Sequence, residues 1–188
     1  MNRIAFPALT FLAAALASAP PAAAQQQQAA DDIANRIISV PAPSRYRVDG
    51  VRTGARVRPD SRVQGGQALR VPVPGRAEQA WATSVAVPIT QPVRRGDNLV
   101  LAFWARLESG ENGATSTVLP YNAVQMAAAP YSALFSGPVT IDGTWKLHEL
   151  RGRADRDYAA DTLNVSIHLA TARQTVDLGP VFVLNMGQ

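Results

Sequence analysis

The sequence predicts an all-β protein built as a two-sheet antiparallel β-sandwich, and three observations indicate this fold. Short apolar runs alternate with turns rich in Gly, Pro and Asp from Gly65 to the C-terminus. Several of these runs alternate apolar and polar residues with a period of two, and no convincing long helix follows Gly65. Because each sheet made of such strands has one apolar face to bury, two packed sheets are expected.

The first 24 residues have the layout of a secretory signal peptide. Met1–Arg3 gives a short positive start, Ile4–Ala17 gives an apolar run, and Ala22–Ala24 follows two prolines. This segment is too short and too interrupted by proline for a membrane span. We therefore expect a secreted or periplasmic protein, cleaved near Ala24.

Residues 25–63 are predicted to be an extended lead-in to the sandwich. The stretch from Ala29 to about Ile38 is compatible with one short helix, and prolines and glycines interrupt the chain from there to Asp60. One or two short strands are expected within this part. The sandwich domain itself is expected to span residues 64–188.

Eight strands are expected after Gly65, because each run of apolar and β-branched residues is bounded by turn residues. Pro120 cannot donate a backbone hydrogen bond, so a bulge or a sheet edge is expected at that position. Asp142-Gly143 predicts a tight turn. The strand ranges, in order, are Ala68–Val73, Val85–Ile89, Asn98–Leu107, Thr115–Gln125, Pro138–Ile141, Thr144–Arg151, Thr162–Ala170 and Thr175–Leu184.

The composition excludes several kinds of site and partner. The chain has no cysteine, which excludes disulfides, thiolate nucleophiles and zinc-thiolate sites. The formal net charge is +4, but the arginines are scattered and form no basic stripe, so nucleic acid is not an expected partner. A solvated surface accounts for the charge, and weak affinity for acidic polysaccharide or cell envelope stays open as an alternative.

Two of the expected strands carry polar and aromatic residues opposite their apolar side. In Asn98–Leu107 these are Trp104 and Arg106, and in Thr162–Ala170 they include Asn164 and His168. If both strands lie in one sheet, this face could bind sugars, because an aromatic ring stacks on a pyranose and planar polar groups bind its hydroxyls. Alternatively, Trp104 packs beneath a loop or the lead-in, and Arg106 neutralises a nearby carboxylate.

Four stretches, in this order, form a recognisable pattern: GGQALRVPVPGRAEQAW (65–81), PITQPVRRGDNLVLAFWAR (88–106), GTWKLHELRGRADRDY (143–158) and LNVSIHLATARQTVDLGPVFVLN (163–185). The pattern covers about two thirds of the chain. It resembles the carbohydrate-binding modules attached to xylanases and related glycoside hydrolases, which have a galactose-binding-domain-like jelly-roll fold. The resemblance implies a jelly roll that binds carbohydrate of the plant cell-wall type, such as xylan.

The resemblance also implies which residues contact sugar. Arg76 and Trp81 match an arginine and an exposed, ligand-stacking tryptophan of xylan-binding members. The other implied positions lie on three strands: Arg106 on the central strand, Tyr121 and Asn122 on the strand that contributes a second aromatic residue, and Asn164 or His168 on the strand that often donates a polar contact. Relatives often carry a carboxylate or glutamine at this last position, so the kind of ligand stays open.

Many relatives of this fold hold a structural calcium ion at one edge, and Asp177 occupies the corresponding place in TVDLGPV. Calcium takes several oxygen ligands, and the sequence supplies one recognisable side chain for it. An ordinary aspartate at a strand turn is the alternative.

No catalytic pattern is recognisable, so we expect a binding protein rather than an enzyme. The two histidines do not form a zinc-protease motif, there is no Gly-x-Ser-x-Gly elbow, and Glu149 has no partner acid of the kind that a glycosidase needs. The expected partners are carbohydrate and a glycoside hydrolase that acts in trans. An envelope jelly roll that binds protein, and a small polysaccharide hydrolase or lyase, remain as alternatives.

Overall fold

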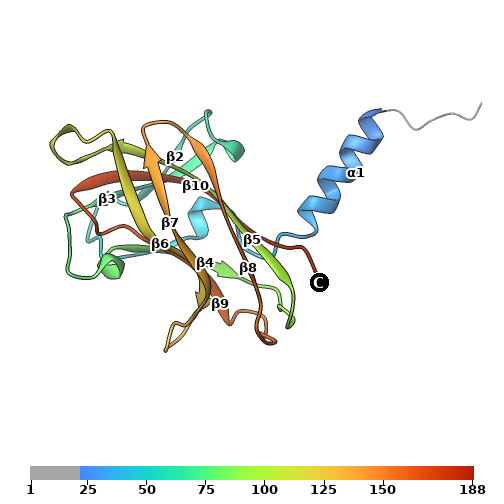
Figure 1. Ribbon diagram of the computed structural model, residues 1–188. Coiled ribbons are helices and arrows are strands. Elements are labelled where there is room, and N and C mark those ends of the chain that lie inside the picture. The colour runs from blue at the N-terminus through green and yellow to red at the C-terminus, as the bar shows by residue number, and fades with distance from the viewer. Residues whose placement is uncertain (1–21) are drawn as a thin grey trace, which may run out of the picture.

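The protein is a sandwich of two five-stranded antiparallel sheets, which confirms the predicted fold class (Figure 1). The computed structural model describes residues 22–188, so nearly all of the predicted signal peptide, residues 1–24, lies outside the described residues. Sheet I has the strand order β1 (Arg47–Asp49), β4 (Ser84–Ile89), β9 (Leu163–His168), β6 (Ser116–Met126) and β7 (Ala133–Asp142). Sheet II has the order β2 (Arg56–Pro59), β3 (Gln67–Val73), β10 (Gln174–Asn185), β5 (Asn98–Ser109) and β8 (Lys146–Arg153).

The apolar sides of the central strands fill the space between the sheets. The fully enclosed side chains include Leu99, Leu101 and Phe103 from β5, Val165 and Ile167 from β9, and Val176, Leu178, Val181 and Val183 from β10. Burial of each such side chain is worth about 1.5–3 kcal/mol relative to exposure. This core explains how a chain without disulfides holds together.

All eight strands that alternation predicts after Gly65 are present. The largest difference is in β7, which begins at Ala133 rather than Pro138. Short 3-10 turns lie between strands: η1 (Pro43–Arg45), η2 (Gln64–Gly66), η3 (Ala80–Ala82) and η4 (Glu111–Gly113).

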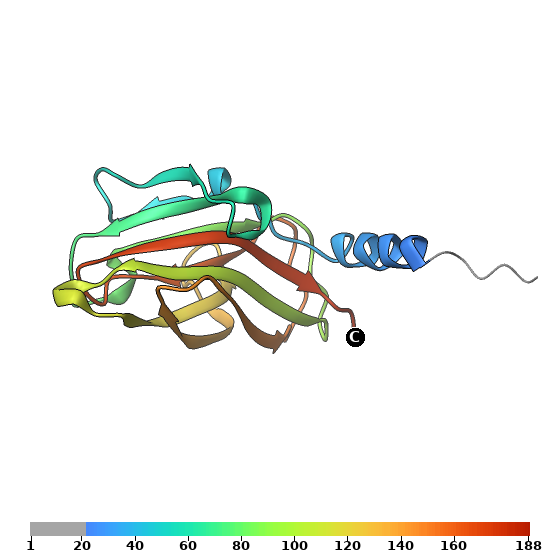
Figure 2. The ribbon, with the colours of Figure 1, turned by 90° about the horizontal axis from the view of Figure 1, so that it is seen from above.

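The lead-in is part of the sandwich, and the domain boundary predicted at residue 64 falls inside the folded unit. β1 pairs with β4 at the edge of sheet I, and β2 pairs with β3 at the edge of sheet II. Ile38, Tyr46 and Val63 are buried. The helix expected near Ala29–Ile38 is α1 (Ala22–Ala34), which extends away from the sandwich in both views (Figure 2). No helix in residues 22–188 is long and apolar enough to cross a membrane.

Two hydroxyl groups of the lead-in replace a missing strand partner of β10. β3 pairs with β10 only as far as Leu178. Beyond that point, the Tyr46 hydroxyl accepts a hydrogen bond from Val181 N at 2.7 Å, and Ser39 Oγ accepts one from Val183 N at 2.8 Å. The lead-in therefore satisfies backbone groups that would otherwise be buried without partners.

A bulge at Pro120 changes which residues of β6 face outward. The pairing of β6 with β7 shifts between Leu119 and Asn122, which confirms the irregularity expected there. One extra residue on β6 reverses the alternation, because side chains along a strand point to opposite faces in turn. Leu119 and Asn122 therefore both point inward, whereas Tyr121 lies on the outer face.

Candidate functional site

The two strands that the sequence combined into one sugar-binding face lie in different sheets. β5, with Trp104 and Arg106, belongs to sheet II, and β9, with Asn164 and His168, belongs to sheet I. Their polar sides form the two opposite outer surfaces of the sandwich. The single face that would have joined these four residues does not exist, so each surface is considered separately.

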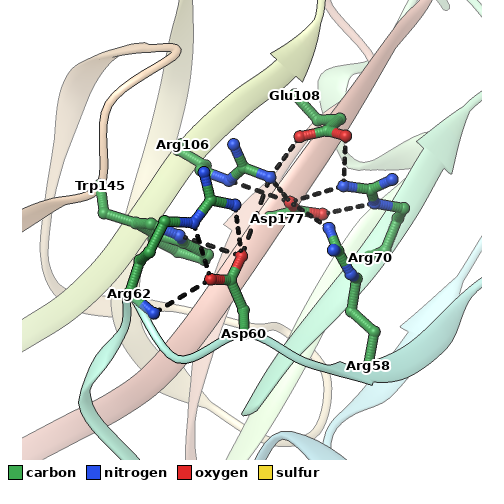
Figure 3. A network of polar contacts seen from close by, with 8 residues as sticks. All are labelled: Arg58, Asp60, Arg62, Arg70, Arg106, Glu108, Trp145 and Asp177. Atoms are coloured by element: carbon green, nitrogen blue, oxygen red, sulfur yellow. Dashed lines mark hydrogen bonds and ion pairs between the residues drawn. The ribbon is translucent and has the colours of Figure 1, made fainter. Parts of the chain in front are cut away.

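The outer surface of sheet II carries a network of arginines and carboxylates around Asp177 (Figure 3). The strand register places Asp177 of β10 directly opposite Arg70 of β3 and Arg106 of β5. Arg70 donates to Asp177 from Nε at 2.8 Å and from Nη2 at 2.9 Å, and Arg106 Nη2 donates at 2.7 Å. Arg58 reaches the same carboxylate at 3.5 Å, and Glu108 pairs with both Arg70 and Arg106.

The loop before β3 is held over this surface by a second carboxylate, Asp60 (Figure 3). Arg62 donates to Asp60 from its backbone N and from both Nε and Nη2, at 2.8–3.1 Å, and Trp145 Nε1 donates to it at 3.3 Å. These bonds hold the pKa of Asp60 well below its ordinary value, chiefly through the Arg62 side chain.

Trp104 and Arg106 have the surroundings that the alternative interpretation expects. Trp104 Nε1 donates to Gln64 Oε1 at 3.2 Å, so the tryptophan is bonded to the η2 turn that precedes β3. Its Cβ lies so close to Gly179 that a side chain there would meet it at 2.8 Å. The Arg106 guanidinium is buried among carboxylates and lies 5.4 Å from the centroid of the Trp145 ring. Both residues are engaged within the chain.

The surroundings of Asp177 do not fit a calcium site. Both carboxylate oxygens accept hydrogen bonds from guanidinium groups, and the side chain is completely enclosed. A hard cation needs several oxygen ligands, whereas Asp177 is surrounded by cations. Within residues 22–188, no group of three or more His, Cys, Asp or Glu side chains is placed to hold a metal ion.

The outer surface of sheet I carries three rows of side chains across β6, β9 and β4, which we call the polar face. The strand register sets these rows. The end rows carry the larger groups, and the middle row carries small ones. The first row is Tyr121, His168 and Ser84; the second is Ala123, Ser166 and Ala86; the third is Gln125, Asn164 and Pro88. Because the side chains of the middle row are small, the surface is lower there than at the two end rows.

Tyr121 and His168 form the aromatic end of the polar face. Their rings stack with centroids 4.3 Å apart and an interplanar angle of 24°. The Tyr121 hydroxyl donates to Gln125 Oε1 at 3.0 Å, which connects the first row to the third. Burial lowers the pKa of His168 to about 4, so its imidazole is neutral at pH 7. A neutral imidazole has one donor and one acceptor for polar partners.

The amide end of the polar face contains Asn164 and a pocket of about 270 Å³. Asn164 is only 8% exposed, and its Oδ1 has no hydrogen-bond donor among the described residues. Three other enclosed side-chain atoms among the described residues also lack a partner, and Asn164 Oδ1 is the one that belongs to the polar face. The pocket is lined by Asn164, Pro88, Ile89, Leu163, Ala86, Ala127, Asp161, Arg45 and Arg47.

The remaining predicted site residues fall in different places. Trp81 lies in η3, three residues before β4, and is 59% exposed. Arg76 is exposed in the loop between β3 and η3. The placement of Asn122 on a binding face is wrong, because the bulge turns it inward, where it is 0% exposed. Its amide donates to the carbonyl oxygens of Leu119 and Gly137, each at 3.0 Å.

Sequence reasoning missed four residues of the polar face and its pocket: Gln125, Ser166, Arg45 and Arg47. Two of these carried a signal, because Ser166 alternates in step with Asn164 and His168, and Gln125 alternates in step with Tyr121. The two arginines carried none. They lie in the lead-in, whose prolines and glycines conceal β1.

No protein-family model matches the chain, and no curated protein sequence matches it. Solved structures do match its fold. A CBM4 module superimposes with a TM-score of 0.55 at 14% identity, over 76% of this chain and 96% of that one. The second N-terminal cellulose-binding domain of β-1,4-glucanase C from Cellulomonas fimi matches with a TM-score of 0.53 at 17% identity, over 76% and 86% of the two chains.

The CBM22-1 xylan-binding domain of Xyn10C from Paenibacillus barcinonensis matches with a TM-score of 0.51 at 12% identity, over 81% of this chain and 93% of that one. These matches span nearly all of the binding modules concerned. At such identities they establish the shared architecture alone. The chain therefore has the β-sandwich fold of carbohydrate-binding modules.

Proposed function

We propose that this protein is an exported, non-catalytic carbohydrate-binding module that binds oligo- or polysaccharide on the polar face of sheet I. The observation that carries the proposal is the combination, on one face, of the stacked Tyr121–His168 pair with the pocket that Asn164 lines. Aromatic rings supply apolar area for a pyranose, and amides bind its hydroxyl groups in fixed directions.

The middle row of small side chains lies between the aromatic end and the amide end of the polar face. His168 and Asn164 are four residues apart on β9, which corresponds to about 13 Å along an extended strand. A short oligosaccharide can span this length, with a ring on the aromatic end and its hydroxyls at the amide end. Trp81 is exposed and lies three residues before Ser84 in the chain, so it is a further aromatic residue to test.

The first ligands to test follow from the matched structures, which include a cellulose-binding domain and a xylan-binding domain. Catalysis would come from a separate glycoside hydrolase acting on the same polysaccharide. The carboxylates of the sheet II network support a binding role for the protein, because each is held by arginine rather than directed at an open groove.

The test is calorimetric titration of the wild-type protein with xylo-, cello- and manno-oligosaccharides. Tyr121→Ala is expected to weaken binding of the preferred sugar by about tenfold or more, the effect of losing an aromatic contact of 1.4 kcal/mol. Phe182→Ala is the matched control, because it removes a half-buried ring from β10 in the opposite sheet. Equal affinity of Tyr121→Ala and wild type contradicts the proposal.

Binding to cell-envelope fractions that none of these sugars displaces would instead support the protein-interaction alternative. Release of new reducing ends or unsaturated products from a polysaccharide would support the enzyme alternative.

A further inference from the structure

We propose that the saccharide bound on the polar face carries a carboxylate, as a uronate does, and that this group binds between Arg45 and Arg47 in the pocket beside Asn164. The inference rests on the proposed function and specifies its ligand class. It concerns a part of the surface that the sequence assigned to the lead-in.

The fold places both arginines at the amide end of the polar face. Arg47 on β1 lies opposite Ala86 on β4, so it shares the outer side of sheet I with the middle row. Arg45 is the last residue of η1 and lines the same pocket. Tyr46, between them, is fixed to β10 and to Pro41 O through its hydroxyl. The backbone that carries the two guanidinium groups is therefore held in position.

The charge balance of this pocket differs from that of the sheet II network. There, each of Arg58, Arg62, Arg70 and Arg106 pairs with at least one carboxylate. Arg45, in contrast, forms no ion pair with any residue of the described chain. Arg47 contacts Asp49 through Nε at 3.0 Å, and both side chains of that pair are largely exposed.

Asp161 is the one acidic residue in the pocket lining. The lining holds two guanidinium groups and one carboxylate, and Asp49, outside the lining, pairs with Arg47, so the Arg45 guanidinium is the one without a carboxylate partner among the described residues. A guanidinium group matches a carboxylate with two parallel hydrogen bonds, a geometry that a neutral sugar does not offer. The pocket thus has the charge and the donor geometry for an anionic ligand.

Asn164 indicates that this anion belongs to a sugar. It lines the same pocket, and a side-chain amide can exchange hydrogen bonds with a hydroxyl group. A uronate presents hydroxyl donors beside its carboxylate on the same ring. One such residue would engage the arginines and Asn164 together, with its neighbours lying along the polar face toward Tyr121.

The experiment compares three uronate-bearing oligosaccharides, of the glucuronoxylan, galacturonate and mannuronate types. Each is paired with its carboxyl-reduced derivative, in which the carboxylate has become a primary alcohol. Calorimetry at low salt is expected to show at least one uronate binding about tenfold more tightly than its reduced partner, the effect of one charge-assisted hydrogen bond. The preference is expected to shrink in 0.5 M NaCl, because salt screens exposed charges.

The double variant Arg45→Gln/Arg47→Gln is expected to lose this preference, so that it binds the uronate and the reduced sugar with equal affinity. Arg151→Gln/Arg153→Gln on β8 is the matched control, since it removes two exposed charges from sheet II. It is expected to retain the preference.

Equal affinity for uronate and reduced sugar in the wild type overturns this inference and leaves the proposed function standing. Absence of binding by these sugars and by the xylo-, cello- and manno-oligosaccharides overturns both. Inorganic phosphate, titrated alone, is expected not to bind measurably. If phosphate binds as tightly as the uronate, the pocket is a site for free anions and the inference is wrong.

Discussion

His168 is the titratable side chain at the centre of the aromatic end of the polar face. Burial lowers its pKa from the ordinary 6.5 to about 4. Between these values the unfolded chain binds a proton at this residue and the folded chain does not. By linkage, its contribution to stability is present above about pH 6.5 and is lost as the pH falls toward 4.

We therefore expect the wild-type protein to lose stability over this interval more steeply than His168→Gln, which has no imidazole to titrate. Thermal unfolding of both proteins between pH 4 and 8 measures the difference. The His148 pKa is also lowered by burial, and this residue is present in both proteins, so its effect cancels in the comparison. An imidazole NMR titration of His168 with a midpoint near 6.5 would contradict the assignment.

Substitutions of two single residues, Trp81 and Trp104, are expected to differ in their effects on sugar binding and on stability. Trp81 is exposed, so Trp81→Ala is expected to weaken oligosaccharide binding by about 1–3 kcal/mol with little change in the free energy of unfolding. Trp104 is bonded to Gln64 of η2 and packs against Gly179, so Trp104→Ala is expected to destabilise the fold by about 2 kcal/mol or more without changing affinity per folded molecule. Urea unfolding measures the stability of both variants, and calorimetry measures their affinity for oligosaccharide. Lower stability of Trp81→Ala together with weaker sugar binding by Trp104→Ala would contradict both assignments.

At the scale of the element, the β6 bulge is supported by Asn122. Its amide satisfies the carbonyl oxygens of Leu119 and Gly137 on the two bulged strands. Asn122→Ala leaves the buried carbonyl oxygen of Leu119 and the partly buried one of Gly137 without this donor, and the expected cost is about 1–3 kcal/mol. Urea unfolding measures it, and a variant as stable as the wild type would show that the bulge does not depend on this side chain.

The strands themselves were predictable because alternation with a period of two is a local property of the sequence. Leu99, Leu101 and Phe103 predict both β5 and its inward side. The pairing of strands is not local. Nothing near Trp104 or Asn164 indicates that β5 and β9 belong to different sheets. The bulge at Pro120 was expected, but its effect on alternation placed Asn122 inside, on the opposite side from the predicted one.

At the scale of the whole molecule, Asp60 in the sheet II network makes the free energy of unfolding depend on pH in the acid range. Asp60 has a pKa well below its ordinary 3.8, so the folded chain keeps it ionised where the unfolded chain takes up a proton. Its contribution is fully present above about pH 4 and is lost as the pH falls below that value.

We expect the thermal midpoint of the wild type to fall between pH 4 and 2, and the fall to be smaller in Asp60→Asn. Glu149→Gln, at an exposed position on β8, is the control and is expected to follow the wild type. Identical acid profiles for Asp60→Asn and wild type would show that the Asp60–Arg62 contacts add no acid-sensitive stability.

The hydroxyl groups of Ser39 and Tyr46 set the shortest piece of this polypeptide that can be transplanted. A graft beginning at Gly65 would leave the amides of Val181 and Val183 uncapped along an open strand border. Unpaired strand edges of this kind form hydrogen bonds with strands of other molecules, which leads to aggregation. A fusion protein that borrows this module must therefore carry the chain from about Arg36 onward, although the sequence there resembles a linker.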